Sequence, residues 1–313
     1  MKKFTTLTSI FLLTTVLSAC AQSYSHHFNS GNSWLGGKEV KASKNYVTKQ
    51  IKVSDFNQIA VSGSLDVTYT QQSGKPKVEI YTSDNIVDLL DIYVKNGKLN
   101  LGFKKNVKVS YNKLEIRVTS EDLNAVNVAG SGDFKFTNGL KTDQLKMNVA
   151  GSGDITASNI QCSQVFTANV AGSGDITASN IQCSQEFTAN VAGSGDIECK
   201  QLKAADMDIS VAGSGDLKIE NALVTSANAS VAGSGTVKIS GNADKANYSV
   251  AGSGDLYAND FKVQNISASV AGSGDIKCHA VEHLKARVSG SGTIGYKGDP
   301  ELDYPEKKKV YKL

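Results

Sequence analysis

The feature that most constrains the fold is the tripeptide Gly-Ser-Gly, which recurs nine times at intervals of 18 to 21 residues. A Val lies two residues before each copy, and Asp or Thr follows it directly. Two units are almost identical, because residues 149–169 and 170–190 differ only at Val165 and Glu186. A fixed short period indicates an array of equivalent units that stack on one another. The copies begin at Gly130, Gly151, Gly172, Gly193, Gly213, Gly233, Gly252, Gly272 and Gly290.

Residue polarity alternates within each unit. Small or apolar residues occupy the even positions from Val170 to Ala178, whereas the odd positions are mostly polar. A period of two predicts β-strand, and further apolar positions give each unit two or three short strands separated by bends. A unit of about 20 residues is too short for a βαβ repeat, which needs roughly 30, but it is long enough for one coil of a β-solenoid. Nine coils about 4.8 Å apart would make a rod about 40 Å long.

Glycine and proline usage agrees with an all-β, parallel solenoid. Leucine-rich repeats share the period but need a Leu-x-x-Leu-x-Leu pattern, which the sequence lacks. Pro76, Pro300 and Pro305 are the only prolines, and all lie outside the array, as an unbroken hydrogen-bond ladder requires. The paired glycines are expected at inward positions in a narrow corner of the coil. A side chain there would collide with the opposite wall, or the backbone would need a positive φ.

The first 20 residues predict export and lipid anchoring. Lys2 and Lys3 precede a modest apolar run, which is typical of a signal peptide and too short to span a membrane. The sequence from Leu17 to Cys20 fits the lipobox, which resembles the site where a bacterial signal is cut and the Cys receives acyl chains such as palmitate. Such chains anchor a protein stably without a transmembrane helix. An ordinary cleaved signal with a chance Cys is the alternative.

The rest of the chain divides by composition. A polar, glycine-containing stretch follows Cys20, irregular strands with an Asn-Gly turn precede the repeats, and a polar tail follows them. Because the end coils of a stack would expose unpaired backbone N–H and C=O groups, the flanking segments are expected to cap the stack. The predicted segments are a signal peptide at 1–19, a tether at 20–45, an irregular β cap at 46–126, the solenoid at 127–297 and a tail at 298–313.

A row of aspartates follows the repeats on the outside of the coils. Stacked carboxylates repel, so something must compensate them. One hypothesis is Ca²⁺, because glycine-rich coils with Asp resemble the calcium-binding nonapeptide of secreted toxins, although spacing and period differ. The favoured hypothesis is that each side chain accepts hydrogen bonds from backbone N–H groups at the corner, since Thr236 and Thr293 replace Asp and a hydroxyl is a poor calcium ligand. The row comprises Asp133, Asp154, Asp175, Asp196, Asp216, Asp255 and Asp275.

No catalytic, metal or cofactor site is predicted. Catalysis needs one special place with distinct acid and base environments, and a row of equivalent carboxylates offers none. Cys162 and Cys183 are expected to stack one coil apart, and Cys199 and Cys278 to be small buried hydrophobes. Zinc at Cys278 and its neighbouring histidines is disfavoured, because alternation points Cys278 inward and His279 outward. A net charge of +3 with scattered lysines does not indicate nucleic-acid binding.

Several motifs resemble the head GIN domain family, whose members are labelled putative auto-transporter adhesins and are common as bacterial lipoproteins. They are VSDFNQIAVSGSLDVTY at 53–69, NGKLNLGF at 96–103, LEIRVTSEDLNAVNVAGSGDFKF at 114–136 and the VAGSGD units. The resemblance extends from about residue 49 to residue 297. It implies a right-handed parallel β-helix at the cell envelope and supplies no site residue.

These features together predict a lipid-anchored envelope solenoid that acts as an adhesin or surface scaffold and is not an enzyme. Its expected partners are the membrane, most simply the outer membrane, and envelope or host glycans or proteins. The alternatives are a polysaccharide-active enzyme and a calcium-stabilised binding rod. A unique acidic cleft would favour the enzyme, whereas an unbroken row of Ser and Asp would favour the binding rod.

Overall fold

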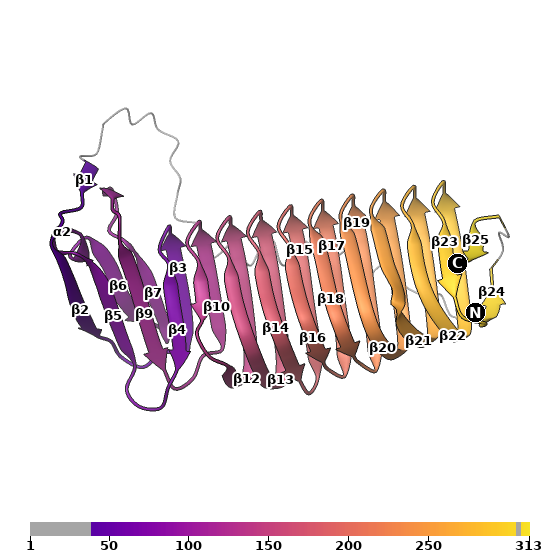
Figure 1. The fold of residues 1–313 in the computed structure, drawn as a ribbon, viewed down its shortest axis with the longest axis horizontal. Coiled ribbons are helices and arrows are strands. Elements are labelled where there is room, and N and C mark those ends of the chain that lie inside the picture. The colour runs from indigo at the N-terminus through magenta and orange to yellow at the C-terminus, as the bar shows by residue number, and fades with distance from the viewer. Residues whose placement is uncertain (1–38, 305–307) are drawn as a thin grey trace.

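The chain folds as one long stack of β-strands (Figure 1). The computed structural model describes residues 39–304 and 308–313. It is nearly all-β, with 72% strand and 1% helix, and forms a β-solenoid of about nine turns. The predicted fold class is therefore confirmed. Cys20 and the predicted signal peptide, with most of the predicted tether, lie outside the described residues.

Each coil has two strand segments joined by the Gly-Ser-Gly corner. In one coil, β15 (Glu186–Gly193) leads through the corner to β16 (Ile197–Lys203). The next coil repeats this with β17 (Asp206–Gly213) and β18 (Asp216–Leu223), which pair in parallel with β15 and β16. Each backbone segment therefore bonds to its equivalent one repeat away, as the period requires.

The remaining coils follow the same plan, and in several of them one strand runs continuously through a bend. The duplicated units lie in register, with Ile155 paired with Ile176 and Phe166 with Phe187. The strands are β10 (Ala125–Gly130), β11 (Phe134–Phe136), β12 (Leu140–Gly151), β13 (Ile155–Gly172), β14 (Ile176–Cys183), β19 (Ser226–Gly233), β20 (Thr236–Gly252), β21 (Asp255–Gly272), β22 (Ile276–Gly290) and β23 (Ile294–Lys297).

Rows of apolar side chains fill the interior, because alternation turns every second residue of a strand inward. One row is the Val that precedes each Gly-Ser-Gly, and its members up to Val270 are at most 2% exposed. Burying such a side chain contributes about 1.5–3 kcal/mol, so the same stabilising contact recurs in every coil. The row comprises Val128, Val149, Val170, Val191, Val211, Val231, Val250 and Val270.

The stack begins earlier than the first Gly-Ser-Gly. β3 (Gln58–Gly63) pairs in parallel with β10, with Gly63 opposite Gly130, and β4 (Val67–Gln71) pairs with β11. The intervening sequence reads Gly-Ser-Leu-Asp, with Leu65 where later coils have the second Gly. This single replacement hides the first coil, which therefore lies within the segment predicted to be an irregular cap.

Residues 72–123 leave this first coil and, together with residues 39–52, cover its open side. β7 (Lys98–Phe103) and β9 (Leu114–Ser120) add in parallel to β3 and β4. The neighbouring strands then run antiparallel, which ends the solenoid. Figure 1 shows these elements at the indigo end of the rod. The strands in antiparallel pairs include β2 (Tyr46–Lys52), β5 (Lys77–Ser83) and β6 (Leu90–Lys95), and α2 (Asp84–Val87) follows β5. β1 (Glu39–Lys41) and β8 (Lys108–Ser110) pair in parallel as a separate two-stranded sheet.

The last described residues add two short parallel strands at the opposite end. β24 (Glu301–Asp303) pairs with β22, and β25 (Val310–Lys312) pairs with β23. Leu302 pairs with Leu284, and the buried Val310 pairs with Ile294. The segment assigned to a tail thus continues the coil pattern. No helix among the described residues is long and apolar enough to cross a bilayer.

Candidate functional site

The predicted aspartate row is a ladder of side chain to backbone hydrogen bonds. In each coil, Oδ1 of the aspartate accepts a bond from the backbone N–H of the equivalent residue in the next coil. The ladder starts one coil earlier than predicted, because Asp66 accepts from the N–H of Asp133 at 3.0 Å. The further acceptor and donor pairs are Asp133–Asp154 (3.0 Å), Asp154–Asp175 (2.8 Å), Asp175–Asp196 (2.8 Å), Asp196–Asp216 (2.7 Å), Asp216–Thr236 (3.0 Å), Asp255–Asp275 (2.9 Å) and Asp275–Thr293 (2.8 Å).

The two threonines end segments of this ladder. The N–H of Thr236 donates to Asp216, but in the next coil the N–H of Asp255 bonds instead to the carbonyl of Gly235 at 3.2 Å. Thr293 donates both its N–H and its Oγ1 hydroxyl to Asp275, at 2.8 and 2.7 Å. This geometry supports the turn-capping hypothesis, because every aspartate of the row uses one oxygen to hold the next corner.

The ladder also carries an electrostatic cost. Burial raises the pKa of Asp175, and the flanking carboxylates of Asp154 and Asp196 raise it further, while the N–H of Asp196 lowers it. Stacked charges therefore disfavour ionisation at the centre of the row, and the N–H bonds offset this in part. In the part of the chain that the structure describes, no three His, Cys, Asp or Glu side chains gather in a way that could hold a metal ion.

The glycines allow the coils to approach closely at this corner. The first Gly of each described Gly-Ser-Gly has a positive φ, for example +138° at Gly172, as expected. A Cβ there would lie 2.3 Å from the carbonyl oxygen of Gly151, and a Cβ on Gly174 would lie 2.1 Å from that of Gly153. The predicted collision with the opposite wall is therefore wrong. The obstacle is the backbone of the preceding coil, which stacks directly against each glycine.

A second ladder, not predicted from the sequence, alternates with the inward side chains of the strands that lead into the corner, and its members Asn148 and Asn169 are buried. The amide Nδ2 of each asparagine donates to Oδ1 of the asparagine in the preceding coil, at 2.7 to 3.0 Å. Ser210 extends the row by donating to Asn190 at 2.6 Å. The recurrence of Asn at intervals of 21 residues was the available signal. The ladder comprises Asn127, Asn148, Asn169 and Asn190.

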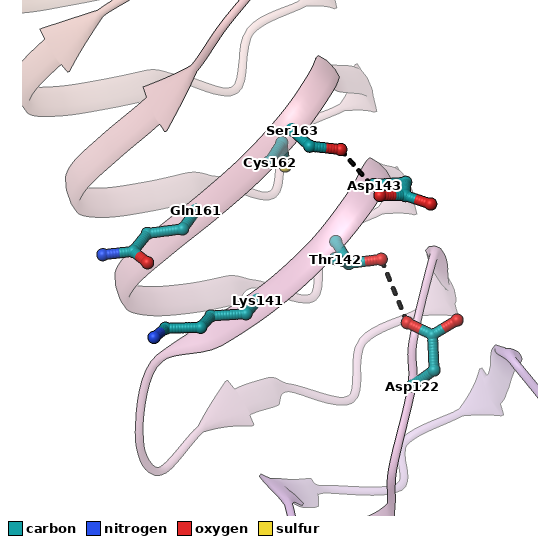
Figure 2. A pocket seen from close by; sticks show the side chains of 7 residues that line it. All are labelled: Asp122, Lys141, Thr142, Asp143, Gln161, Cys162 and Ser163. Carbon is teal, nitrogen blue, oxygen red and sulfur yellow. Dashed lines mark hydrogen bonds between the residues drawn. The ribbon is translucent and has the colours of Figure 1, made fainter.

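One open, polar depression lies on another corner of the early coils (Figure 2). Thr142 Oγ1 donates to Asp122 Oδ1 at 3.0 Å, and Ser163 Oγ donates to Asp143 Oδ1 at 2.6 Å. Each carboxylate is thus held by a hydroxyl 20 residues later in the chain, in the next coil, and Figure 2 shows the two pairs one above the other. They do not face each other across a cleft, as a glycosidase acid and base would. The lining residues are Asp122, Lys141, Thr142, Asp143, Gln161, Cys162 and Ser163.

The described cysteines are buried thiols. Cys162 and Cys183 are register neighbours on β13 and β14, as expected, and both are free. Burial is the main cause that raises the pKa of Cys162 to about 12 and that of Cys183 to about 11. Cys199 and Cys278 are also buried. Because the thiolate is the nucleophile and the metal ligand, these cysteines act as small hydrophobes.

The chain resembles a known family over most of its length. The family described as "Putative auto-transporter adhesin, head GIN domain" matches residues 55–237 and 190–300. A putative adhesin from Parabacteroides merdae has a solved structure with 24% identity and a TM-score of 0.49, covering 88% of this chain and 99% of that one. A putative adhesin from Parabacteroides distasonis has 26% identity and a TM-score of 0.47, covering 88% and 100%. A search of curated proteins found no match.

Proposed function

Because the chain belongs to the head GIN domain family of putative auto-transporter adhesins, we propose that it is a lipid-anchored β-solenoid of the bacterial cell envelope that binds surface partners. The family indicates an envelope or surface protein with an adhesin-like role. The finer proposal is that the rod acts as an adhesin or scaffold for envelope or host glycans or proteins, without enzymatic turnover, and that its anchor is in the outer membrane.

The observation that carries this proposal is the equivalence of the coils. The aspartate ladder forms the same hydrogen bond from coil to coil, so the outer surface presents similar groups at successive repeats. Coils spaced about 4.8 Å apart suit a partner that itself repeats or is contacted at many points. An enzyme would instead need one position that differs from the rest.

A coil-deletion variant tests whether binding is distributed over the rod. The purified full chain and a variant lacking residues 170–190 would be compared for binding to envelope polysaccharide, host-surface glycans and matrix proteins. Because every coil offers similar contacts, loss of one coil should weaken binding a few-fold. Complete loss of binding would place the contact in one coil and contradict a distributed surface.

The enzyme alternative is tested at the depression shown in Figure 2. Asp122→Asn and Asp143→Asn each remove one carboxylate while they keep the shape of the side chain. We expect no release of reducing sugar from envelope or host glycans by the parent chain or by either variant. Turnover by the parent chain that either substitution abolishes would establish the enzyme.

The proposed anchor is tested at Cys20. Cys20→Ser should prevent acylation, so the chain should remain soluble or keep its signal peptide. The parent chain should instead fractionate with membranes after metabolic labelling with palmitate. A processed, labelled Cys20→Ser protein in the membrane fraction would contradict the lipobox assignment. Protease treatment of intact cells would then show which side of the membrane the rod faces.

A further inference from the structure

Charge is distributed unevenly along the rod. Residues 39–123, which form the capped end, contain 13 Lys and Arg against 10 Asp and Glu. Residues 124–297 contain 13 Lys and Arg against 16 Asp and Glu. The capped end is therefore positive and the coil array is negative, although the whole chain is close to neutral.

Six exposed lysines lie on or beside the small sheet of β1 and β8 and form a patch. Figure 1 shows β1 at the upper edge of the cap, above α2. Strand pairing places Lys41 opposite Ser110, close to Lys108. The Nζ of Lys113 lies 5.5 Å from the ring centroid of Tyr46, and the backbone of Lys104 bonds to Leu89 beside α2. The lysine patch comprises Lys41, Lys44, Lys104, Lys105, Lys108 and Lys113.

Two acidic groups near this patch have partners of their own, whereas Glu39 of β1 lies opposite Lys108 within the patch. Asp84 accepts bonds from Ser43 at 2.5 Å and Asn45 at 2.8 Å, which lowers its pKa. Asp88 forms an ion pair with Lys49 at 2.7 Å. No ion pair joins a patch lysine to an acidic group among the described residues. The charge of Lys104 helps to lower the pKa of Asp88, and Lys108 lies opposite Glu39, but the six lysines together leave a surplus of positive charge for an anionic partner outside the chain.

We propose that the lysine patch binds the headgroups of anionic phospholipids and holds the capped end against the bilayer, so that the rod points away from it. This inference rests on the proposed lipid anchor. The chain enters the described structure at Glu39 in β1, within the patch. The 18 residues between Cys20 and Glu39 span at most about 65 Å when fully extended, so an anchor at Cys20 keeps the cap near the membrane. Clustered lysines beside an anchor bind anionic lipid surfaces, as polybasic segments do.

Two features favour a membrane over other anionic partners. Tyr93 on β6 of the same cap is 46% exposed, and tyrosine is favoured at membrane interfaces, where its ring and hydroxyl meet different surroundings. The coil array beyond the cap is negative, so an anionic membrane repels it while attracting the cap. The rod would thus be oriented by charge as well as by its tether.

The test measures lysine protection in the full chain mixed with vesicles. Vesicles of phosphatidylcholine alone would be compared with vesicles that contain phosphatidylglycerol. After flotation, lysines would be acetylated briefly and mapped by mass spectrometry. Patch lysines should react at least three-fold more slowly on the anionic vesicles, and the protection should fade at high salt because screening shortens the range of the attraction. Lysines of the coils should react equally on both.

Matched variants isolate the patch. In one variant, all six patch lysines become Gln. In the control, six exposed coil lysines become Gln, so the change in net charge is the same. The patch variant should lose the lipid-dependent difference in flotation or protection, and the control should keep it. Circular dichroism would confirm that both variants fold. The control substitutions are at Lys135, Lys200, Lys203, Lys238, Lys245 and Lys262.

The outcomes separate the patch from the anchor. If the protein floats with both vesicle types and the patch lysines are protected equally on both, the proposal that the patch binds anionic lipid is wrong, whereas the proposed lipid anchor stands. If the protein floats only with anionic vesicles and the patch variant does not float, lipid binding by the patch is supported and the proposed lipid anchor is wrong. Flotation with neither would overturn both. Equal protection of the patch by a DNA oligonucleotide would overturn the assignment to phospholipid.

Discussion

The ring of Phe166 lies against the ring of Phe187 in the next coil, with centroids 5.4 Å apart and ring planes within 2° of parallel. These residues are equivalent positions of the duplicated 21-residue unit, paired in register on β13 and β15. Duplication of the sequence has therefore produced two coils with the same side chains, one stacked on the other.

Deletion of residues 170–190 should leave a shorter, folded rod. The deletion removes one whole coil, and the new neighbours have the same pattern, so the array loses only one unit and one interface. We expect a modest decrease in the melting temperature, with the β circular dichroism spectrum retained.

Deletion of only residues 170–179 is the matched control for coil stacking. It shifts every later strand against its neighbour and misplaces both inward side chains and corner glycines. We expect a much larger loss of thermal stability, or failure to fold. Equal melting temperatures for the two deletions would show that the copies are not interchangeable coils.

Alanine substitutions at two corner glycines should lower the free energy of unfolding by very different amounts. Gly63 has φ +86° with no atom within 4 Å of an added Cβ, so Gly63→Ala should cost only the backbone strain, about 1–3 kcal/mol. Gly172→Ala adds a clash at 2.3 Å with the carbonyl of Gly151, so it should cost roughly 4 kcal/mol or more. Urea unfolding measures both. Equal costs would show that close stacking is not what requires glycine.

Replacement by Phe should change the free energy of unfolding in opposite directions at two buried tyrosines. The hydroxyl of Tyr248 is buried without a hydrogen-bond partner, so Tyr248→Phe should stabilise the chain by about 1–3 kcal/mol. The hydroxyl of Tyr69 bonds to Ser120 Oγ at 3.0 Å, so Tyr69→Phe should destabilise it by about 1 kcal/mol. Urea unfolding gives both values. A loss of stability in Tyr248→Phe would indicate a bonding partner for that hydroxyl in solution.

Substitutions at Asp175 separate hydrogen bonding from charge. Asp175→Ala leaves the N–H of Asp196 without its acceptor and should cost about 1 kcal/mol. Asp175→Asn keeps an acceptor oxygen and removes the charge, so at neutral pH it should be at least as stable as the parent chain. The two melting temperatures at pH 7 test this, and the opposite order would contradict the capping role.

The raised pKa of Asp175 also predicts the pH dependence. A carboxyl whose pKa is raised on folding binds its proton more tightly in the folded chain. Its stabilising contribution is full below the unfolded pKa of about 3.9 and is lost as the pH rises through the folded value. The free energy of unfolding of the parent chain should therefore fall relative to that of Asp175→Asn as the pH rises through this window. A constant difference between pH 3 and 7 would contradict the raised pKa.

Much of this architecture was predictable because the period is local. Gly-Ser-Gly at fixed spacing predicted equivalent coils, alternation predicted which side chains are inside, and Thr236 and Thr293 favoured turn capping over calcium binding. The first coil was missed, because Leu65 replaces a glycine there and 52 residues separate this coil from the next. Which coil follows another in space is a long-range relation that the local pattern does not contain.

By itself, the sequence determined the solenoid, its inward rows and its corners, since a repeat shorter than a βαβ unit can bury its apolar face only against its own copies. Only the tertiary structure shows that the backbone of the preceding coil lies against each corner glycine, that the asparagines bond to one another, and that six lysines distant in sequence lie on one patch. Those features depend on contacts between residues from different coils or from distant strands of the cap. Such contacts exist only once the backbone hydrogen bonds have brought these strands within a few ångströms of one another.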